Sequence, residues 1–264
     1  MSALIVIPAR YASSRFPGKP LAKETGKFLI QHVVEQTWRV DLASQVVVAT
    51  DDQRIFDAVR SFGGTPLMTS DQHQSGTDRI AEVIQKPQYA GADIIVNVQG
   101  DEPEIDPALV NHLIRVLQRN PAADLATAAT PFHDANDVAN PNMVKVVTDA
   151  NNFALYFSRS VIPHNRDGGP AGIPYLKHLG LYAYRRNALL ALADAPPCDI
   201  ETLEKLEQLR ALYLGMKIHV TITSTAPHGI DTPEDYAAFI ARYNEGIESG
   251  NPSPKTSDSG PSNH

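Results

Sequence analysis

The sequence has only one cysteine, Cys198, in 264 residues. An intrachain disulfide and a zinc site built from several cysteines are therefore excluded, which fits a reducing compartment. The apolar residues 3–7 are interrupted at once by Pro8, Arg10 and Arg15, so a signal-peptide core is missing, and no apolar run is long enough to span a bilayer. We therefore expect a cytoplasmic protein that has no membrane partner.

The chain also has fewer positive than negative side chains, and its formal net charge is −7. Nonspecific nucleic-acid binders need clustered positive charge to displace counterions from phosphate backbones, so nucleic acid is not an expected partner. Both common nucleotide fingerprints are missing too. No GxGxxG occurs, which argues against a Rossmann dehydrogenase, and Gly18-Lys19 is followed by Pro20 instead of Ser or Thr, which excludes a Walker A loop.

The first half of the chain alternates short β-branched apolar runs with apolar residues at helical spacing. Strands are predicted over residues 3–7, 45–49, 66–68 and 94–98, with helices in the intervals. This order indicates an α/β fold around a mostly parallel sheet. The run 94–98 is nearly continuous, as in a central strand, and it ends at the polar residues 99–103, where open α/β sheets place ligands.

The second half is less regular and indicates a mixed sheet. Strands are predicted over residues 144–148, 155–158, 180–184 and 218–223, and one helix over 200–212. We expect a single domain, 1–245, with a nucleotide-binding half of about 1–130 and a half of about 131–245 that binds a second substrate and supplies a dimer surface. Residues 246–264 are rich in Ser, Pro, Asn and Gly, and we expect a disordered tail there.

Residues 7–21 place three cations in the loop that leaves the first predicted strand: Arg10, Arg15 and Lys19. Small residues in this loop allow backbone N–H groups to approach a polyphosphate. The two arginines can pair with phosphate bidentately, and the lysine can act as a point charge. On composition alone, a basic surface loop without a ligand is an alternative.

Residues 8–21 resemble the signature of the sugar cytidylyltransferases, and in detail that of the members that use the acidic sugar 3-deoxy-manno-octulosonate (Kdo). Further similar stretches follow in the same order over residues 4–240, at 48–51, 73–79, 96–103, 140–145, 155–159, 178–180, 206–210 and 229–235. The resemblance implies a Rossmann-like nucleotidyltransferase fold, with a central, mostly parallel mixed sheet flanked by helices and a smaller sugar-binding and dimerisation region. It also implies a homodimer.

The activity that the resemblance implies is transfer of CMP from CTP to the anomeric hydroxyl of Kdo, giving CMP-Kdo and pyrophosphate for lipopolysaccharide or a related glycan. The implied catalytic residues are Arg10, Lys19, Asp101 and Asp231. The two aspartates are the implied Mg²⁺ ligands, and carboxylates at strand ends suit that ion. Either aspartate alone is also compatible with a helix N-cap. We expect Glu102 and Asp235 to be structural.

The resemblance also implies two sets of binding residues. The nucleotide set is Ala9, Arg10, Ser14, Arg15, Lys19, Ala49, Thr50, Asp51, Arg79 and Gln99. The sugar set is Gln99, Arg159, His178, Tyr182, Glu207 and Gln208, with Arg159 as the clamp for the sugar carboxylate.

Several of these residues have ordinary alternatives. Arg79 is compatible with a solvated arginine, His178 with a core histidine, Tyr182 with a strand aromatic, and residues 207–208 with a solvated helix face. Two other functions also stay open. One is the same chemistry on another acidic sugar, such as sialic acid or an amino-substituted Kdo. The other is a nucleotide-binding regulator without catalysis.

Overall fold

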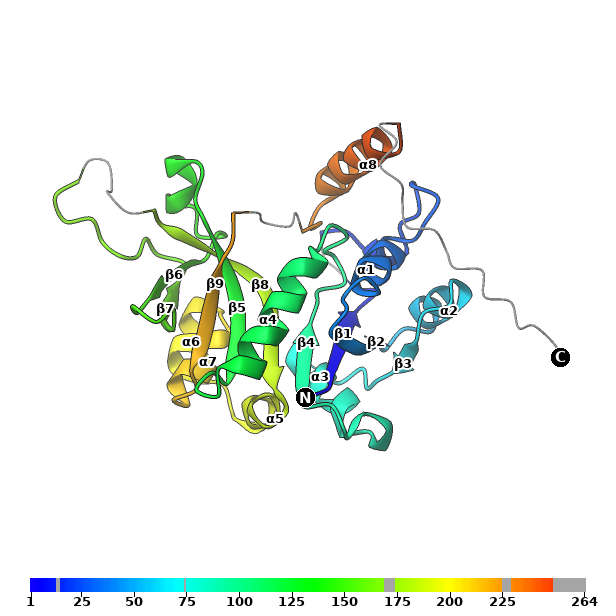
Figure 1. Cartoon of the computed structure of the whole chain (residues 1–264). Coiled ribbons are helices and arrows are strands. Elements are labelled where there is room, and N and C mark those ends of the chain that lie inside the picture. The colour runs from blue at the N-terminus through cyan, green and yellow to red at the C-terminus, as the bar shows by residue number, and fades with distance from the viewer. Residues whose placement is uncertain (13–14, 74, 169–173, 225–228, 249–264) are drawn as a thin grey trace.

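The computed structural model describes residues 1–12, 15–73, 75–168, 174–224 and 229–248. Within these residues one nine-stranded sheet runs through the molecule in the order β3-β2-β1-β4-β8-β5-β9, and β6 pairs with β8 and with β7 (Figure 1). The strands are β1 (Ala3–Ala9), β2 (Ala43–Thr50), β3 (Pro66–Met68), β4 (Ile94–Asn97), β5 (Leu125–Pro131), β6 (Lys145–Thr148), β7 (Ala154–Ser158), β8 (Leu176–Arg185) and β9 (Ile218–Ile222).

The sheet is mixed but mostly parallel along its main path. Strands β1 to β4 are mutually parallel, and β5 is parallel to β9. Only β8 runs against its neighbours β4 and β5. The predicted fold class is therefore confirmed. Because β8 comes from the second half of the chain and lies between two strands of the first, both halves share one sheet, and the division near residue 130 stays a prediction.

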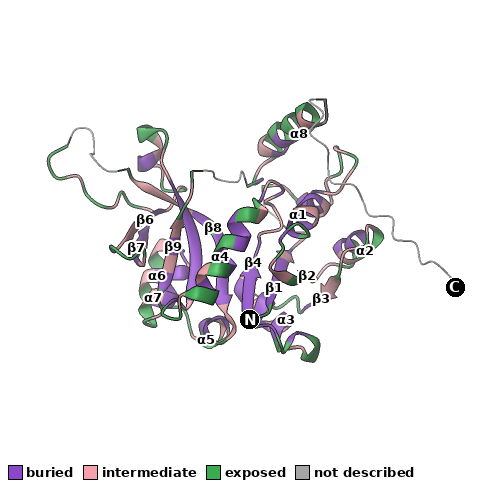
Figure 2. Cartoon of the chain, in the orientation of Figure 1, coloured by how far each residue is buried: buried purple, intermediate pink, exposed green. Residues whose placement is uncertain are grey.

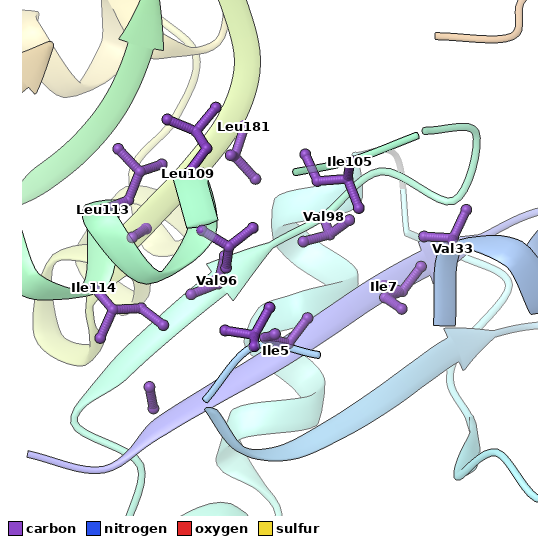
Figure 3. Close-up of a cluster of buried hydrophobic side chains, with 14 of the residues drawn as sticks. Ile5, Ile7, Val33, Val96, Val98, Ile105, Leu109, Leu113, Ile114 and Leu181 are labelled. Atoms are coloured by element: carbon purple, nitrogen blue, oxygen red, sulfur yellow. The ribbon is translucent and has the colours of Figure 1, made fainter. Parts of the chain in front are cut away.

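Helices cover both faces of the sheet, and their outward surfaces are exposed while the central strands β1, β4 and β5 are buried (Figure 2). On one face, α1, α2 and α4 bury apolar side chains; Figure 3 shows Leu109 and Leu113 of α4 beside Val96 of β4. On the other face, α3, α5 and α7 do the same. The helices are α1 (Leu29–Thr37), α2 (Gln53–Ser61), α3 (Gly76–Gln85), α4 (Pro107–Arg119), α5 (Arg186–Asp194), α6 (Asp199–Glu204), α7 (Gln208–Tyr213) and α8 (Pro233–Glu248).

The structure corrects three sequence-based expectations. The single helix predicted over 200–212 is wrong, because Lys205 adopts a left-handed conformation (φ 53°) that ends α6 before α7 begins. Strand β5 was not predicted, since its sequence is mostly Ala and Thr. The tail prediction is wrong for residues 246–248, which belong to α8; residues 249–264 lie outside the described part of the chain. In that part, no helix is long and apolar enough to cross a membrane.

Helix α8 lies against α1, above the carboxyl end of β1 (Figure 1). Tyr236 and Phe239 pack with Leu29 and Phe16 in a small apolar cluster of their own. His32 of α1 sits edge-on to the Phe239 ring, with the ring centroids 5.1 Å apart. This packing fixes the start of α8, and with it the turn that contains Asp231, beside the loop that follows β1.

Candidate functional site

A cleft of about 430 Å³ opens at the carboxyl ends of β1 and β4. Seven predicted site residues line it: Ala9, Arg10, Arg15, Lys19, Gln99, Asp101 and Asp231. A glycine suits the floor of the cleft, because a Cβ atom on Gly100 would lie only 3.0 Å from the carbonyl oxygen of Pro8. The loops after β1 and β4 thereby approach closely enough to form one site.

Lys19 lies at the centre of this cleft, with its side chain only 10% exposed. Its Nζ donates to Asp101 Oδ2 at 2.7 Å and to the carbonyl oxygen of Ile230 at 2.5 Å, and it lies 3.8 Å from Asp231 Oδ1. Arg15 Nη2 is 3.0 Å from the same Asp231 oxygen. Two carboxylates that are far apart in the sequence therefore converge on one lysine. The structure brings these predicted residues together, and their functional roles stay predictions.

Neither aspartate is a helix N-cap. The N-cap of α4 is Asp106, five residues beyond Asp101. At the start of α8, Asp235 Oδ2 accepts hydrogen bonds from the backbone N–H groups of Asp231 and Thr232, and the Thr232 hydroxyl accepts one from Asp235 N–H. The structural role predicted for Asp235 is confirmed, and the carboxylate of Asp231 is left to the two cations.

Glu102, predicted to be structural, has one carboxylate oxygen buried without a hydrogen-bond partner among the described residues. Burial raises the pKa of Glu102 to about 8, and the charge of neighbouring Asp101 acts in the same direction.

Arg10 borders the cleft and also braces a second loop. Its Nη2 donates to the carbonyl oxygens of His73 and Ser75 at 3.0 and 2.9 Å. Burial lowers the pKa of Arg10, and the nearby charge of Arg79 lowers it further. Arg10 therefore fixes the segment 73–79, which leads into α3, against the exit of β1.

The residues predicted to bind the nucleoside lie beside these contacts of Arg10. Ala49 and Thr50 are fully buried at the end of β2, and Asp51 accepts a 2.6 Å hydrogen bond from Arg79 Nη2. Arg79 has no exposed surface, so the solvated-arginine alternative is wrong. Its Nη1 donates to Thr69 Oγ1 at 2.5 Å, whereas its Nε has no hydrogen-bond partner among the described residues. The predicted Ser14 lies outside the described residues.

A polar network continues from the cleft across both halves of the chain. Gln99 Nε2 donates to Asn97 Oδ1 at 3.4 Å. Burial raises the pKa of the nearby Tyr184 hydroxyl, and Thr77 and Asn97 act against this shift. The Thr77 hydroxyl donates in turn to Glu207 Oε1. Burial raises the pKa of Glu207. The network ends at the start of α7, in the half of the chain expected to bind the sugar.

The sequence analysis did not select three members of this network, Asn97, Thr77 and Tyr184. Asn97 gave a usable signal, because it is a polar residue inside an otherwise apolar central strand. Thr77 lies within the stretch 73–79 that carried the resemblance. The solvated-face alternative is wrong for residues 207–208, since Glu207 is hydrogen-bonded and Gln208 is 9% exposed.

His178 and Tyr182 of β8 lie beside this network, with their ring centroids 5.3 Å apart and their ring planes tilted by 50°. Burial lowers the pKa of His178 to about 3, so the imidazole is neutral at physiological pH. The Tyr182 hydroxyl is buried and has no hydrogen-bond partner among the residues that the structure describes. An unpaired buried hydroxyl is costly, and a ligand hydroxyl would satisfy it.

Arg159 lies at the end of β7, but its guanidinium is occupied. It donates to the carbonyl oxygens of Glu204, Pro141 and Lys205 at 2.6, 2.9 and 3.4 Å. These bonds hold the turn between α6 and α7 against the loop before β6. The role of Arg159 as a clamp for the sugar carboxylate stays a prediction.

Known proteins share both the sequence and the arrangement of this chain. A cytidylyltransferase family model matches residues 4–218. A 3-deoxy-manno-octulosonate cytidylyltransferase of Geobacter sulfurreducens is 50% identical over 251 residues, which are 92% of this chain and 99% of the relative. The protein of the same name from Pseudomonas syringae pv. syringae is 49% identical over 239 residues, or 88% of this chain and 94% of the relative.

Solved structures agree with these sequence matches. A CMP:2-keto-3-deoxy-manno-octonic acid synthetase complexed with CTP superposes with a TM-score of 0.87 at 44% identity, covering 93% of this chain and 99% of that one. A cytidylyltransferase of Leptospira borgpetersenii shares the fold alone, with a TM-score of 0.60 at 16% identity over 97% of this chain and all of that one. The family model, the relatives and the cleft around Lys19 lead to the same conclusion: this chain belongs to the cytidylyltransferase family.

Proposed function

We propose that this protein transfers CMP from CTP to the anomeric hydroxyl of 3-deoxy-manno-octulosonate, releasing pyrophosphate. The observation that carries the proposal is the convergence of Lys19, Arg15 and two aspartates in one cleft. Gln99 joins this cleft to the buried polar side chains around Tyr184 and Glu207, which we take as the acceptor pocket. One part suits a polyphosphate and the other a polyol. The names of the relatives support CTP and Kdo as the two substrates. The product would then serve lipopolysaccharide or related glycan synthesis.

The donor set of the cleft fits Mg²⁺. Asp101 and Asp231 face one point, because a single atom, Lys19 Nζ, lies 2.7 and 3.8 Å from their oxygens. Among the described residues no group of three His, Cys, Asp or Glu side chains could hold a metal ion. Mg²⁺ commonly takes only one or two carboxylates and completes its shell with substrate phosphates and waters. When bound there, the ion would stabilise charge on the phosphate oxygens.

The chain's own residues supply positioning and charge. Lys19 and Arg15 neutralise the two aspartates before substrate binds, so the cleft is held in shape without a ligand. When CTP is bound, Lys19, Arg15 and Arg10 offset the negative charge of the departing pyrophosphate. Phosphoryl transfer of this kind depends mainly on alignment and electrostatic stabilisation. We assign no protein general base.

Acceptor binding falls to the network around Tyr184. Glu207 and the neutral His178 can accept hydrogen bonds from sugar hydroxyls, and the unpaired Tyr182 hydroxyl can donate one. These groups are uncharged or singly charged, which suits a polyol better than a sugar phosphate.

Pyrophosphate release tests the proposal. Purified protein should release pyrophosphate from CTP and Mg²⁺ with Kdo, and far more slowly with ATP, GTP or UTP. Sialic acid and an amino-substituted Kdo would be run in parallel, and a faster rate with either would reassign the acceptor. Release with no acidic sugar, in the presence of tight CTP binding by calorimetry, would favour a regulator. Chelation by EDTA should abolish turnover, and added Mg²⁺ should restore it.

A homodimer and a cytoplasmic location also belong to this proposal. Three large apolar side chains of the second half are strongly exposed in the isolated chain, namely Leu155, Leu203 and Tyr213. Exposed apolar side chains of this size suit a protein–protein contact. Light scattering after gel filtration should give about twice the 28.7 kDa of one chain.

A further inference from the structure

Strand β8 contains a two-residue bulge at the edge of the proposed acceptor pocket. On β5, Thr127 pairs with Tyr182, but the next residue, Ala128, pairs with Leu179. Residues 180–181 of β8 therefore have no partner on β5. Beyond the bulge the strand also changes its other neighbour, because residues 182–185 pair with β4, whereas residues 176–177 pair with β6.

The bulge brings two acceptor residues together. A regular strand rises 3.2–3.4 Å per residue, so residues four apart are separated by about 13 Å. His178 and Tyr182 are four apart, yet their ring centroids lie 5.3 Å from each other. Leu181 belongs to the opposite face, where Figure 3 shows it near Leu109 of α4. Bulges often re-aim side chains next to active sites.

A single hydroxyl lies at the centre of this bulge. Thr127 has no exposed surface, and its Oγ1 lies 2.8 Å from the carbonyl oxygen of Leu181, 3.1 Å from that of Leu179 and 3.0 Å from His178 Nε2. Both carbonyl oxygens can only accept, so the one hydroxyl hydrogen is used for them. The bond to His178 then requires the imidazole to donate. In the neutral ring this places the hydrogen on Nε2 and leaves Nδ1 as an acceptor.

We propose that Thr127 is a positioning residue of the acceptor pocket: its hydroxyl fixes the β8 bulge and holds His178 as the Nε2–H tautomer, so that Nδ1 accepts a hydrogen bond from a sugar hydroxyl. The assignment of the sugar rests on the proposed function, but the tautomer does not. Thr127 touches no substrate in this scheme. It acts through His178.

Thr127→Val removes the hydroxyl at nearly constant volume, and Thr127→Ser retains it. Thr130→Val is a matched control, because Thr130 is a buried threonine of the same strand whose hydroxyl has no hydrogen-bond partner among the described residues. In Thr127→Val we expect KM for Kdo to rise about tenfold, the effect of losing one well-made hydrogen bond. KM for CTP should change less than twofold. Thr127→Ser should recover most of the affinity for Kdo, and Thr130→Val should match the parent protein.

The tautomer of His178 is measured by ¹⁵N NMR of the imidazole nitrogens in the full chain. The signals of His178 are assigned by their absence from the spectrum of His178→Gln. We expect a protonated Nε2 and a bare Nδ1 in the parent protein, and a mixture of tautomers in Thr127→Val. A protonated Nδ1 in the parent protein would overturn the proposal even if Kdo is the substrate. So would an unchanged KM for Kdo in a folded Thr127→Val protein. Should that variant fail to fold, the parent spectrum and Thr127→Ser still decide. Failure of pyrophosphate release with every acidic sugar would overturn the proposed function but leave the spectrum as the test of Thr127.

Discussion

Replacing Lys19 by methionine tests whether this lysine holds the catalytic cleft together. Methionine keeps most of the length of the side chain but removes the ammonium group, which contacts Asp101, Asp231 and the carbonyl oxygen of Ile230. Breaking a fully buried ion pair from one side costs about 3–5 kcal/mol. Asp101 keeps 32% of its side chain exposed, so water compensates in part and we expect a loss of about 1–3 kcal/mol. For a chain of this size, Tm should fall by roughly 3–10 °C.

Turnover should fall much further than stability. Loss of one preorganised charge facing a transition state typically lowers kcat by about 10²–10³. The assay is pyrophosphate release at saturating CTP and Kdo, at a temperature where calorimetry shows the variant fully folded. Lys23→Met is the matched control: Lys23 is exposed and its Nζ lies 4.6 Å from the centroid of the Phe28 ring, so both quantities should stay near those of the parent protein. A folded Lys19→Met enzyme with kcat within about threefold of the parent would refute the proposed role of Lys19.

Three other perturbations test different parts of the structure. Thr77→Val should break the link to Glu207 and raise KM for the acidic sugar at least tenfold while KM for CTP is unchanged; an equal rise in both would show a general distortion. Arg210→Leu should lower the free energy of urea unfolding by about 3–5 kcal/mol, because Glu201 is left buried and unpaired; a loss below 1 kcal/mol contradicts this. Burial lowers the pKa of His32 to about 4 from an ordinary 6.5. The contribution of the neutral His32 imidazole to the free energy of unfolding is therefore complete above pH 6.5. It is lost as pH falls toward 4, and the loss is about 2 kcal/mol at pH 5. The loss of stability between pH 7.5 and 5 should be smaller by that amount in His32→Phe, and equal losses would be inconsistent with a neutral buried imidazole.

Elements with a strong local pattern could be predicted from the sequence. A strand over residues 94–98 was predicted because β-branched and apolar runs mark buried strands, and β4 covers 94–97. Strand β5 was missed because alanine and threonine give no such contrast, and its strand conformation is imposed by its neighbours β8 and β9. The division between α6 and α7 was missed for a related reason: the apolar spacing continues through Lys205, and only its backbone conformation ends the helix.

The phosphate side of the site was more accessible to sequence analysis than the acceptor side. Arg10, Lys19 and Asp101 stand in loops directly after predicted strands, where topology alone brings them together. The acceptor pocket instead depends on which strand lies next to which. Tyr182 lies opposite Asn97 only because β8 runs antiparallel to β4, and that pairing leaves no mark in the local sequence.

The position of β8 has a consequence for how acceptor preference can change in this fold. One strand covers the edge of β4 and, on its other side, the edge of β5, so it cannot be exchanged without rebuilding two ladders at once. A chimera joined near residue 130 would keep β4 and β5 from one parent and take the strand between them from another. Every residue pair between β8 and its neighbours β4 and β5 would then combine residues from two different parents. We expect such hybrids to fold poorly and to expose strand edges. New acceptors should therefore arise by substitution within an intact sheet and not by recombination of its two halves.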